Sequence, residues 1–236
     1  MLSVVVFKWK PRAGYRSTYG PAQVHALRNM VTRHYSEPHR FICVTDDPTG
    51  LDAGVEVVPL WDDHARVPNP SFPDGPSCYR RLKVFSRDIG SVLGERFVCI
   101  DLDVVITGDL RPLWNRPEPF VGWRDPVRKW PYNGSMFMLT AGARPDVWET
   151  FDPATSPALS SEAGMRGSDQ GWMSYCLGWD EPAWDESDGV ISFQREIKKN
   201  AGRLPKTARI VVFWGKHDPW SRQAQALAPW IKEHYR

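Results

Sequence analysis

The chain has 236 residues, of which 42% are hydrophobic, and a formal net charge of +2. This length and apolar content support a folded chain with a substantial core, and the low net charge leaves no strong footprint for nucleic acid as the main ligand. The cysteines show no paired spacing, so we expect reduced thiols in a cytoplasmic protein rather than a zinc site or disulfide framework. No stretch of the sequence reaches membrane-spanning length.

Short β-type runs alternate with helical patterns along the chain. The runs cover residues 3–7, 40–45, 55–59, 97–101, 120–123, 134–140, 189–193 and 209–214. Apolar residues at helical spacing predict one helix after Pro21 and another between Cys78 and Ile89. Residues 67–76 and 153–167 are predicted to be loops. The alternation predicts a single α/β domain over residues 1–236, with a mixed, mostly parallel central sheet flanked by helices.

The apolar run 97–106 contains two carboxylates, Asp101 and Asp103. Buried charge is costly unless it is paired or bound, so this strand is expected to emerge into a functional crevice. In an extended chain, residues i and i+2 project to the same side, which would let both carboxylates bind one Mn²⁺ or Mg²⁺ together with substrate phosphates. An isolated D-x-D pattern is common, and on its own two solvated aspartates explain it better.

A second acidic pair, Asp46 and Asp47, follows the strand predicted at residues 40–45. Ligands of such sheets gather at the carboxyl ends of strands, so this pair is expected to face the same crevice as Asp101 and to bind a nucleoside. A turn over residues 47–50 is the alternative for Asp47.

Several motifs occur in order between about residues 77 and 220. They are CYRRLK at 78–83, the run 97–106, GDLRPLW at 108–114, YNGS at 132–135, SDQ at 168–170, FWG at 213–215 and PW at 219–220. Together they resemble the sugar-nucleotide-dependent glycosyltransferases of the GT-A fold, and among these glycosyltransferase family 8, which includes bacterial galactosyltransferases and glycogenin. The resemblance implies a GT-A-type α/β fold and hexosyltransferase activity.

The resemblance also implies roles for individual residues. Arg81 matches an arginine that reaches the phosphates or the sugar, and its forked donors suit such oxygens. Lys83 lies on another part of the same helix surface, and a solvated helix face is the alternative for both. Asn133 follows an aromatic residue and precedes a strand start, so its amide is expected to hydrogen-bond sugar or acceptor hydroxyls in the crevice, although an asparagine before a glycine can also simply cap a turn. Gly134 is assigned with it to substrate binding.

Asp169 and Gln170 are expected to open a helix that has Ser168 as its N-cap. The resemblance implies that Asp169 binds hydroxyls of the donor sugar, while ordinary charge complementarity at a helix start is the alternative. Gln170 matches the residue near the reacting carbon in retaining relatives. Because an amide is a poor nucleophile, we expect Gln170 to position the sugar rather than to attack it.

The last motif departs from the family. Relatives carry a histidine as third metal ligand three residues before the glycine that corresponds to Gly215, and a lysine just before the Pro-Trp pair. Here those positions hold Val212 and Asp218. Either metal binding is weaker here or a neighbour substitutes. His217 is the candidate for the third ligand, with a surface loop histidine as the alternative, and Lys216 is the candidate for the phosphate contact. Two further residues of this loop, Lys216 and Trp220, are assigned with Gly215 to substrate binding.

The predicted function is metal-dependent transfer of a sugar from a nucleoside-diphosphate sugar, with uridine as the expected base and retention implied by the family. The acceptor is not identified and could be a glycan, a lipid-linked glycan, a protein or a modified base. A haloacid dehalogenase-type magnesium phosphatase is one alternative, because it also places D-x-D-x-V after an apolar strand. A non-catalytic sugar-nucleotide-binding pseudoenzyme is another, because Val212 replaces the histidine. The aromatic residues near the C-terminus, among them Trp220 and Trp230, leave open a peripheral membrane contact.

Overall fold

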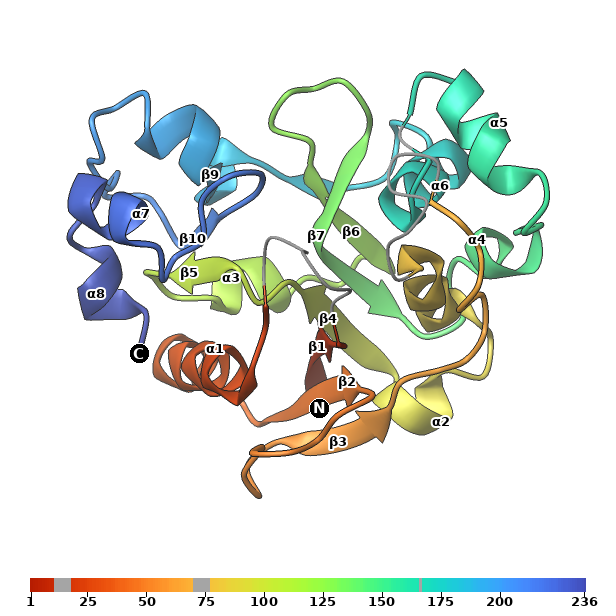
Figure 1. Ribbon diagram of the computed structural model, residues 1–236, viewed down its shortest axis with the longest axis horizontal. Coiled ribbons are helices and arrows are strands. Elements are labelled where there is room, and N and C mark those ends of the chain that lie inside the picture. The colour runs from red at the N-terminus through yellow and green to blue at the C-terminus, as the bar shows by residue number, and fades with distance from the viewer. Residues whose placement is uncertain (11–17, 70–76, 166) are drawn as a thin grey trace.

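The computed structural model describes residues 1–10, 18–69, 77–165 and 167–236. A seven-stranded sheet in the order β3-β2-β1-β4-β7-β6-β8 lies at its centre, and a three-stranded sheet in the order β5-β10-β9 lies beside it (Figure 1). The strands are β1 (Leu2–Lys8), β2 (His39–Thr45), β3 (Glu56–Pro59), β4 (Arg96–Ile100), β5 (Val104–Ile106), β6 (Phe120–Arg124), β7 (Tyr132–Thr140), β8 (Ala183–Trp184), β9 (Val190–Ser192) and β10 (Ile210–Val212).

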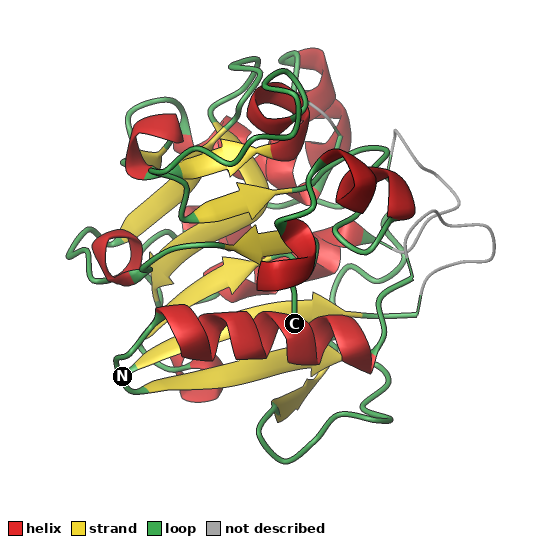
Figure 2. Cartoon of the chain, turned by 90° about the vertical axis from the view of Figure 1, so that its left-hand side faces the viewer, coloured by secondary structure: helices red, strands yellow, loops and turns green. Residues whose placement is uncertain are grey.

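Helices flank the sheet on both sides, in front of and behind the stacked strands of Figure 2. The α-helices are α1 (Pro21–His34), α2 (Gly90–Leu93), α3 (Arg111–Trp114), α4 (Asp146–Glu149), α5 (Ser156–Glu162), α6 (Asp169–Leu177), α7 (Arg222–Leu227) and α8 (Ile231–His234). Two 3₁₀ segments, η1 (Cys78–Phe85) and η2 (Glu186–Asp188), and a π-helical turn, η3 (Phe193–Ile197), complete the helical elements.

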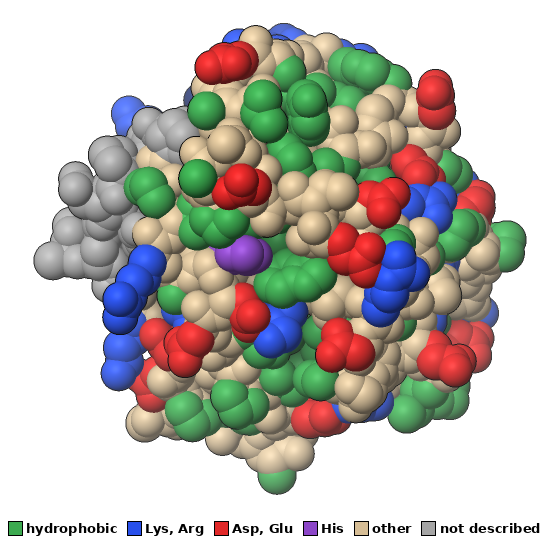
Figure 3. All heavy atoms as spheres, turned by 90° about the vertical axis from the view of Figure 1, so that its right-hand side faces the viewer, with side chains coloured by type: hydrophobic (Ala, Val, Ile, Leu, Met, Phe, Trp, Pro, Cys, Tyr) green, Lys and Arg blue, Asp and Glu red, His purple; other side chains and the backbone are tan. Residues whose placement is uncertain are grey.

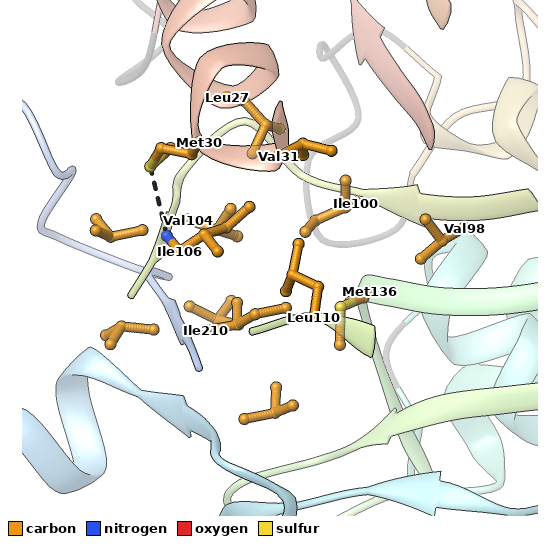
Figure 4. Close-up of a cluster of buried hydrophobic side chains, with 14 of the residues drawn as sticks. Leu27, Met30, Val31, Val98, Ile100, Val104, Ile106, Leu110, Met136 and Ile210 are labelled. Atoms are coloured by element: carbon orange, nitrogen blue, oxygen red, sulfur yellow. Dashed lines mark hydrogen bonds between the residues drawn. The ribbon is translucent and has the colours of Figure 1, made fainter. Parts of the chain in front are cut away.

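The central strands are apolar on both sides because side chains alternate between two cores. In β4, Val98 and Ile100 join the core beneath α1, whereas Phe97 and Cys99 join the core beneath η1 and α6. Figure 4 shows the first core, in which the sulfur of Met30 accepts a hydrogen bond from the Ile106 amide at 3.4 Å. This alternation decides which face a residue just beyond β4 can reach.

The predicted α/β architecture is confirmed, with a strand at each of the eight runs. Four of the six pairings in the central sheet, β1–β2, β1–β4, β2–β3 and β6–β8, are parallel, and β7 runs antiparallel to both β4 and β6. The predicted loop at 153–167 is wrong over α5, where Pro157 starts the helix and Ser160 is buried against the domain. Of the other predicted loop, residues 70–76 lie outside the described residues.

All four cysteines are free thiols, and Cys43 and Cys99 are buried in strands as expected. Among the described residues, no helix is both long and apolar enough to cross a membrane. Acidic, basic and apolar side chains are interspersed over the face drawn in Figure 3, with no area of a single sign of charge. That distribution agrees with the low net charge.

Candidate active site

Asp101 lies directly beyond the carboxyl end of β4. Its amide donates to the carbonyl of Ser135 in β7 at 2.8 Å, which fixes the position of the backbone. Because Phe97 and Cys99 face η1 and α6, the next residue in that alternation, Asp101, faces them too. The carboxylate is therefore delivered to the side of the sheet where Arg81 lies.

Arg81 connects three parts of the chain. Its Nη1 lies 3.1 Å from Asp101 Oδ1, its Nε lies 3.1 Å from Asp169 Oδ2, and its Nη2 donates to the Gly134 carbonyl at 2.5 Å. The side chains of Arg81 and Asp169 are only 16% and 13% exposed. A forked guanidinium is suited to holding two carboxylates and a carbonyl at once.

The start of α6 forms the opposite wall. Ser168 is the N-cap, as predicted, and its hydroxyl accepts from the Gly171 amide at 3.1 Å. Gln170 then turns its Oε1 toward the Gly134 amide, which donates to it at 2.9 Å. A Cβ at residue 134 would lie 3.1 Å from the Cβ of Gln170, so glycine permits this close approach. Both backbone groups of Gly134 are thus held by predicted site residues.

Burial and the charges within this cluster shift the pKa values of its members. Burial raises the pKa of Asp101, against the opposing effects of Arg81 and of a hydrogen bond from Ser135. Burial alone would lower the pKa of Arg81, but the charges of Asp169 and Asp101 outweigh it and raise that pKa. Burial also raises the pKa of Cys78, beside Asp169, to about 12. Ser135 and Cys78 belong to the YNGS and CYRRLK motifs, but nothing in the sequence indicated that they act on Asp101 and Asp169.

Asp103 departs from the extended geometry expected of the D-x-D pattern. The strand stops at Ile100 and the chain bends at residues 102 and 103 before β5 begins. Asp103 is buried, and its carbonyl accepts from the Phe213 amide at 2.9 Å. Burial, followed by the charges of Asp103 and Asp218, raises the pKa of Tyr235. The two carboxylates of the motif therefore have different neighbours.

The donor set can be compared with what a divalent ion requires. Among the described residues, no group of three or more His, Cys, Asp or Glu side chains is arranged to hold a metal. Val212, at the family's histidine position, is buried in β10 opposite Val104. Mg²⁺ and similar hard ions are often bound by one or two carboxylates plus substrate phosphates. Asp101 and Asp103 supply the two carboxylates that such an arrangement needs, and the described residues offer no third protein ligand grouped with them.

The loop after β10 lies beside Asp103. Gly215 has φ of +76°, a left-handed conformation that favours glycine, and Lys216 next to it is exposed. The Nδ1 atom of His217 lies 3.0 Å from Nε2 of Gln194. Trp220 is partly buried, and its ring meets that of Tyr19 edge-on at 5.9 Å.

Other predicted residues lie in local contacts of their own. Asp46 accepts from the Lys10 amide at 3.0 Å, and Asp47 accepts from the Thr49 amide at 3.1 Å, which is the turn proposed as its alternative. The Thr49 hydrogen bonds lower the pKa of Asp47. Asn133 lies within β7 and accepts from the Ser135 amide at 3.0 Å.

Lys83 points away from Arg81 and forms an ion pair with Asp63 at 2.6 Å. A cavity of about 840 Å³ lies nearby, lined by Asp62, His64, Ala65, Arg66, Val67, Pro68, Pro153 and Ala154. It contains none of the predicted site residues. A much smaller cavity of about 10 Å³, room for one water at most, adjoins Arg81, Gly134, Asp169 and Gln170. We therefore place the candidate active site at the Arg81 cluster and not at the larger cavity.

The structure has an α/β fold of the nucleotide-diphospho-sugar transferase type, and Asp101 lies directly beyond the carboxyl end of its central strand β4. No protein-family model matches the sequence, and no curated protein matches it either. Solved structures do match. One is the galactosyltransferase LgtC in complex with donor and acceptor sugar analogues, with a TM-score of 0.64, 12% identity, and coverage of 99% of this chain and 96% of that chain.

Two further structures extend the comparison. An active-site mutant of LgtC, in which glutamate replaces glutamine, matches with a TM-score of 0.63 at 13% identity over 99% of this chain and 96% of that chain. The glycosyltransferase GlyE from Streptococcus pneumoniae TIGR4 matches with a TM-score of 0.60 at 13% identity, over 98% of this chain and 61% of that chain. At such identities the likeness shows the fold alone, and it confirms the GT-A-type fold expected from the motifs.

Proposed function

We propose that this chain is a glycosyltransferase that moves a hexose from a nucleoside-diphosphate sugar, with UDP as the expected nucleotide, to an acceptor hydroxyl. The observation that supports this most is the cluster in which Arg81 joins Asp101 to Asp169 beside Gly134 and Gln170. It gathers residues from η1, β4, β7 and α6 at one edge of a sheet that has the fold of LgtC and GlyE.

In the proposed reaction, the bond between the anomeric carbon and the diphosphate oxygen breaks and its electron pair stays with the diphosphate. The acceptor oxygen forms the new bond to that carbon, and its proton passes to the departing diphosphate or to water. Asp169 binds sugar hydroxyls, and Gln170 positions the sugar, as the active-site glutamine of LgtC suggests by analogy. A divalent ion, Mn²⁺ or Mg²⁺, held by Asp101 and Asp103 would supply positive charge to the departing diphosphate. Retention of configuration remains part of the proposal.

The test is a panel of sugar nucleotides, assayed for release of nucleoside diphosphate and for a rise in melting temperature, with and without Mn²⁺. We expect one sugar nucleotide to be hydrolysed slowly and to stabilise the protein. Asp103→Ala should abolish metal-dependent turnover while the protein stays folded. The matched control is Asp109→Ala, which removes a carboxylate that is 40% exposed and forms an ion pair with Arg111 at 2.9 Å, outside the candidate site.

The outcomes separate the rival functions. Binding of a sugar nucleotide without any turnover would support the non-catalytic alternative. Hydrolysis of p-nitrophenyl phosphate, with no release of nucleoside diphosphate, would support the phosphatase. Unchanged activity of Asp103→Ala with full metal dependence would refute the proposed role of the carboxylates.

A further inference from the structure

The contact between Gln194 and His217 determines which nitrogen of the histidine carries the proton. Gln194 Nε2 lies 3.2 Å from the Trp214 carbonyl oxygen and 3.0 Å from His217 Nδ1. A carbonyl oxygen only accepts, so the amide atom facing it is the nitrogen, and its two hydrogens can serve both contacts. The His217 Nδ1 atom is therefore a hydrogen-bond acceptor.

A neutral imidazole has one donor nitrogen and one acceptor nitrogen. With Nδ1 accepting from Gln194, the proton of His217 resides on Nε2. A histidine that binds a metal usually shows the opposite pattern, donating its second ring N–H to a carboxylate, a carbonyl or water. An amide N–H pointed at Nδ1 works against that pattern and against the charged form, in which both nitrogens are donors.

Neighbouring contacts hold this arrangement in place. Gln194 belongs to η3, which Ser192 caps by accepting from the Arg195 amide at 3.2 Å. The same Ser192 hydroxyl oxygen accepts from Trp214 Nε1 at 2.8 Å, which fixes the residue whose carbonyl orients Gln194. The side-chain amide of Gln194 is thus held between η3 and the loop after β10.

The loop that carries His217 starts beside Asp103. The Phe213 amide is bonded to the Asp103 carbonyl, so the loop starts directly beside a residue of the D-x-D pair. Gly215 then reverses the chain in a left-handed conformation, and His217 follows half-buried. A neutral N–H donor on this loop would complement phosphate oxygens, which only accept, if the diphosphate lies at the carboxylates.

Resting on the proposed function, we propose that His217 donates a hydrogen bond from Nε2 to the diphosphate of the sugar nucleotide, and that Gln194 is the positioning residue that fixes this tautomer. His217 is then a phosphate-binding residue and not the third metal ligand expected from the sequence. The metal would be bound by the two carboxylates and the diphosphate, without a histidine.

The affinity for UDP, measured by calorimetry in EDTA and again in Mn²⁺, distinguishes the two roles. We expect His217→Ala to lower UDP affinity about tenfold in both buffers, because one hydrogen bond to a charged group is lost. His217→Gln, whose amide can donate from a similar reach, should recover most of that loss. His39→Ala, at the amino end of β2 and so at the opposite end of the parallel strands, is the matched control and should bind UDP as the wild type does.

A loss seen in Mn²⁺ but absent in EDTA would show that His217 is a metal ligand and would overturn the proposal. The role of Gln194 is read from nitrogen-15 correlation spectra of the histidine rings, with the His217 signals identified by their loss in His217→Ala. The wild type should show protonated Nε2 and bare Nδ1, and Gln194→Leu should lose this single pattern without loss of folding. Protonated Nδ1 in the wild type would refute the inference, whether or not UDP binds. A wild-type protein that binds no nucleoside diphosphate would refute the proposed function itself.

Discussion

Replacing Arg81 by methionine should be among the most destabilising single changes in this chain. The methionine keeps much of the apolar volume but removes the charge that Asp101 and Asp169 share, at 3.1 Å from each. The side chains of Arg81, Asp101 and Asp169 are 16%, 32% and 13% exposed, so solvent can replace little of the lost interaction. Breaking a buried ion pair from one side costs about 3–5 kcal/mol. For a chain of this size that corresponds to a melting temperature lowered by about 6–20 °C.

The same variant should respond to pH in a defined direction. The pKa of Asp101 is raised in the folded protein by burial, while Arg81 opposes that rise. Between the ordinary aspartate pKa of about 4 and the raised value, the folded state binds more protons than the unfolded state, so this group's contribution to stability falls as pH rises. Without Arg81 the pKa of Asp101 should rise further. The stability gap between variant and wild type should therefore narrow as the pH is lowered.

Chemical unfolding at several pH values tests both expectations. Arg87→Met is the matched control, since Arg87 and its partner Glu149 are 67% and 41% exposed and such pairs contribute about 0–1 kcal/mol. Adding Asp169→Asn to Arg81→Met should cost less than the two single changes together, because the second removes one of the stranded charges. If Arg81→Met lost less than about 1 kcal/mol of unfolding free energy, or if its difference from the wild type grew as the pH was lowered, Arg81 would not be the group that neutralises this cluster.

Two further predictions concern the start of α6. Asp169→Asn should lower sugar transfer about a hundredfold through misplacement of the sugar, with UDP affinity changed little; a defect confined to UDP affinity would contradict its sugar-facing role. Ser168→Ala should cost about 1 kcal/mol in unfolding free energy and Ser168→Gly only a few tenths, because the cap bond to the Gly171 amide is lost but glycine suits the N-cap backbone. Equal costs for the two variants would show that this cap does not stabilise the helix.

Hydrophobic periodicity predicted the elements that are both long and regular. Helix α1 was predicted from Val24, Leu27 and Val31, all of which are fully buried. The two-residue strand β8 carries too little pattern to be recognised, and only its pairing with β6 defines it. Helix α5 was missed because its sequence, SPALSSE, has the small residues of a loop, whereas tertiary packing buries Ser156 and Ser160.

The sequence also located the acidic residues of the candidate site but not their pairing. Asp101 and Asp169 are 68 positions apart, and nothing in either motif indicates that both bind the same arginine. The two-residue periodicity of a strand failed for Asp103 because the strand ends one residue before Asp101. The sequence could not show that Lys83 lies outside the cluster that Arg81 forms, because only the fold brings Asp63 beside Lys83.

Position 212 shows how the core limits which residues of the last motif can reach the candidate site. Val212 is fully buried between β5 and β9, opposite Val104 and Ser192, so its side chain belongs to the core of the smaller sheet. Apolar packing at this position stabilises the sheet from which the His217 loop departs. A side chain of this segment that is to bind substrate must therefore come from beyond the strand, where the chain leaves the core. The loop places Lys216 and His217 there, and the contact from Gln194 gives His217 a defined donor nitrogen. The hydrogen-bonding groups that this loop presents therefore depend on two segments, η3 and the loop itself, and no single sequence motif contains both.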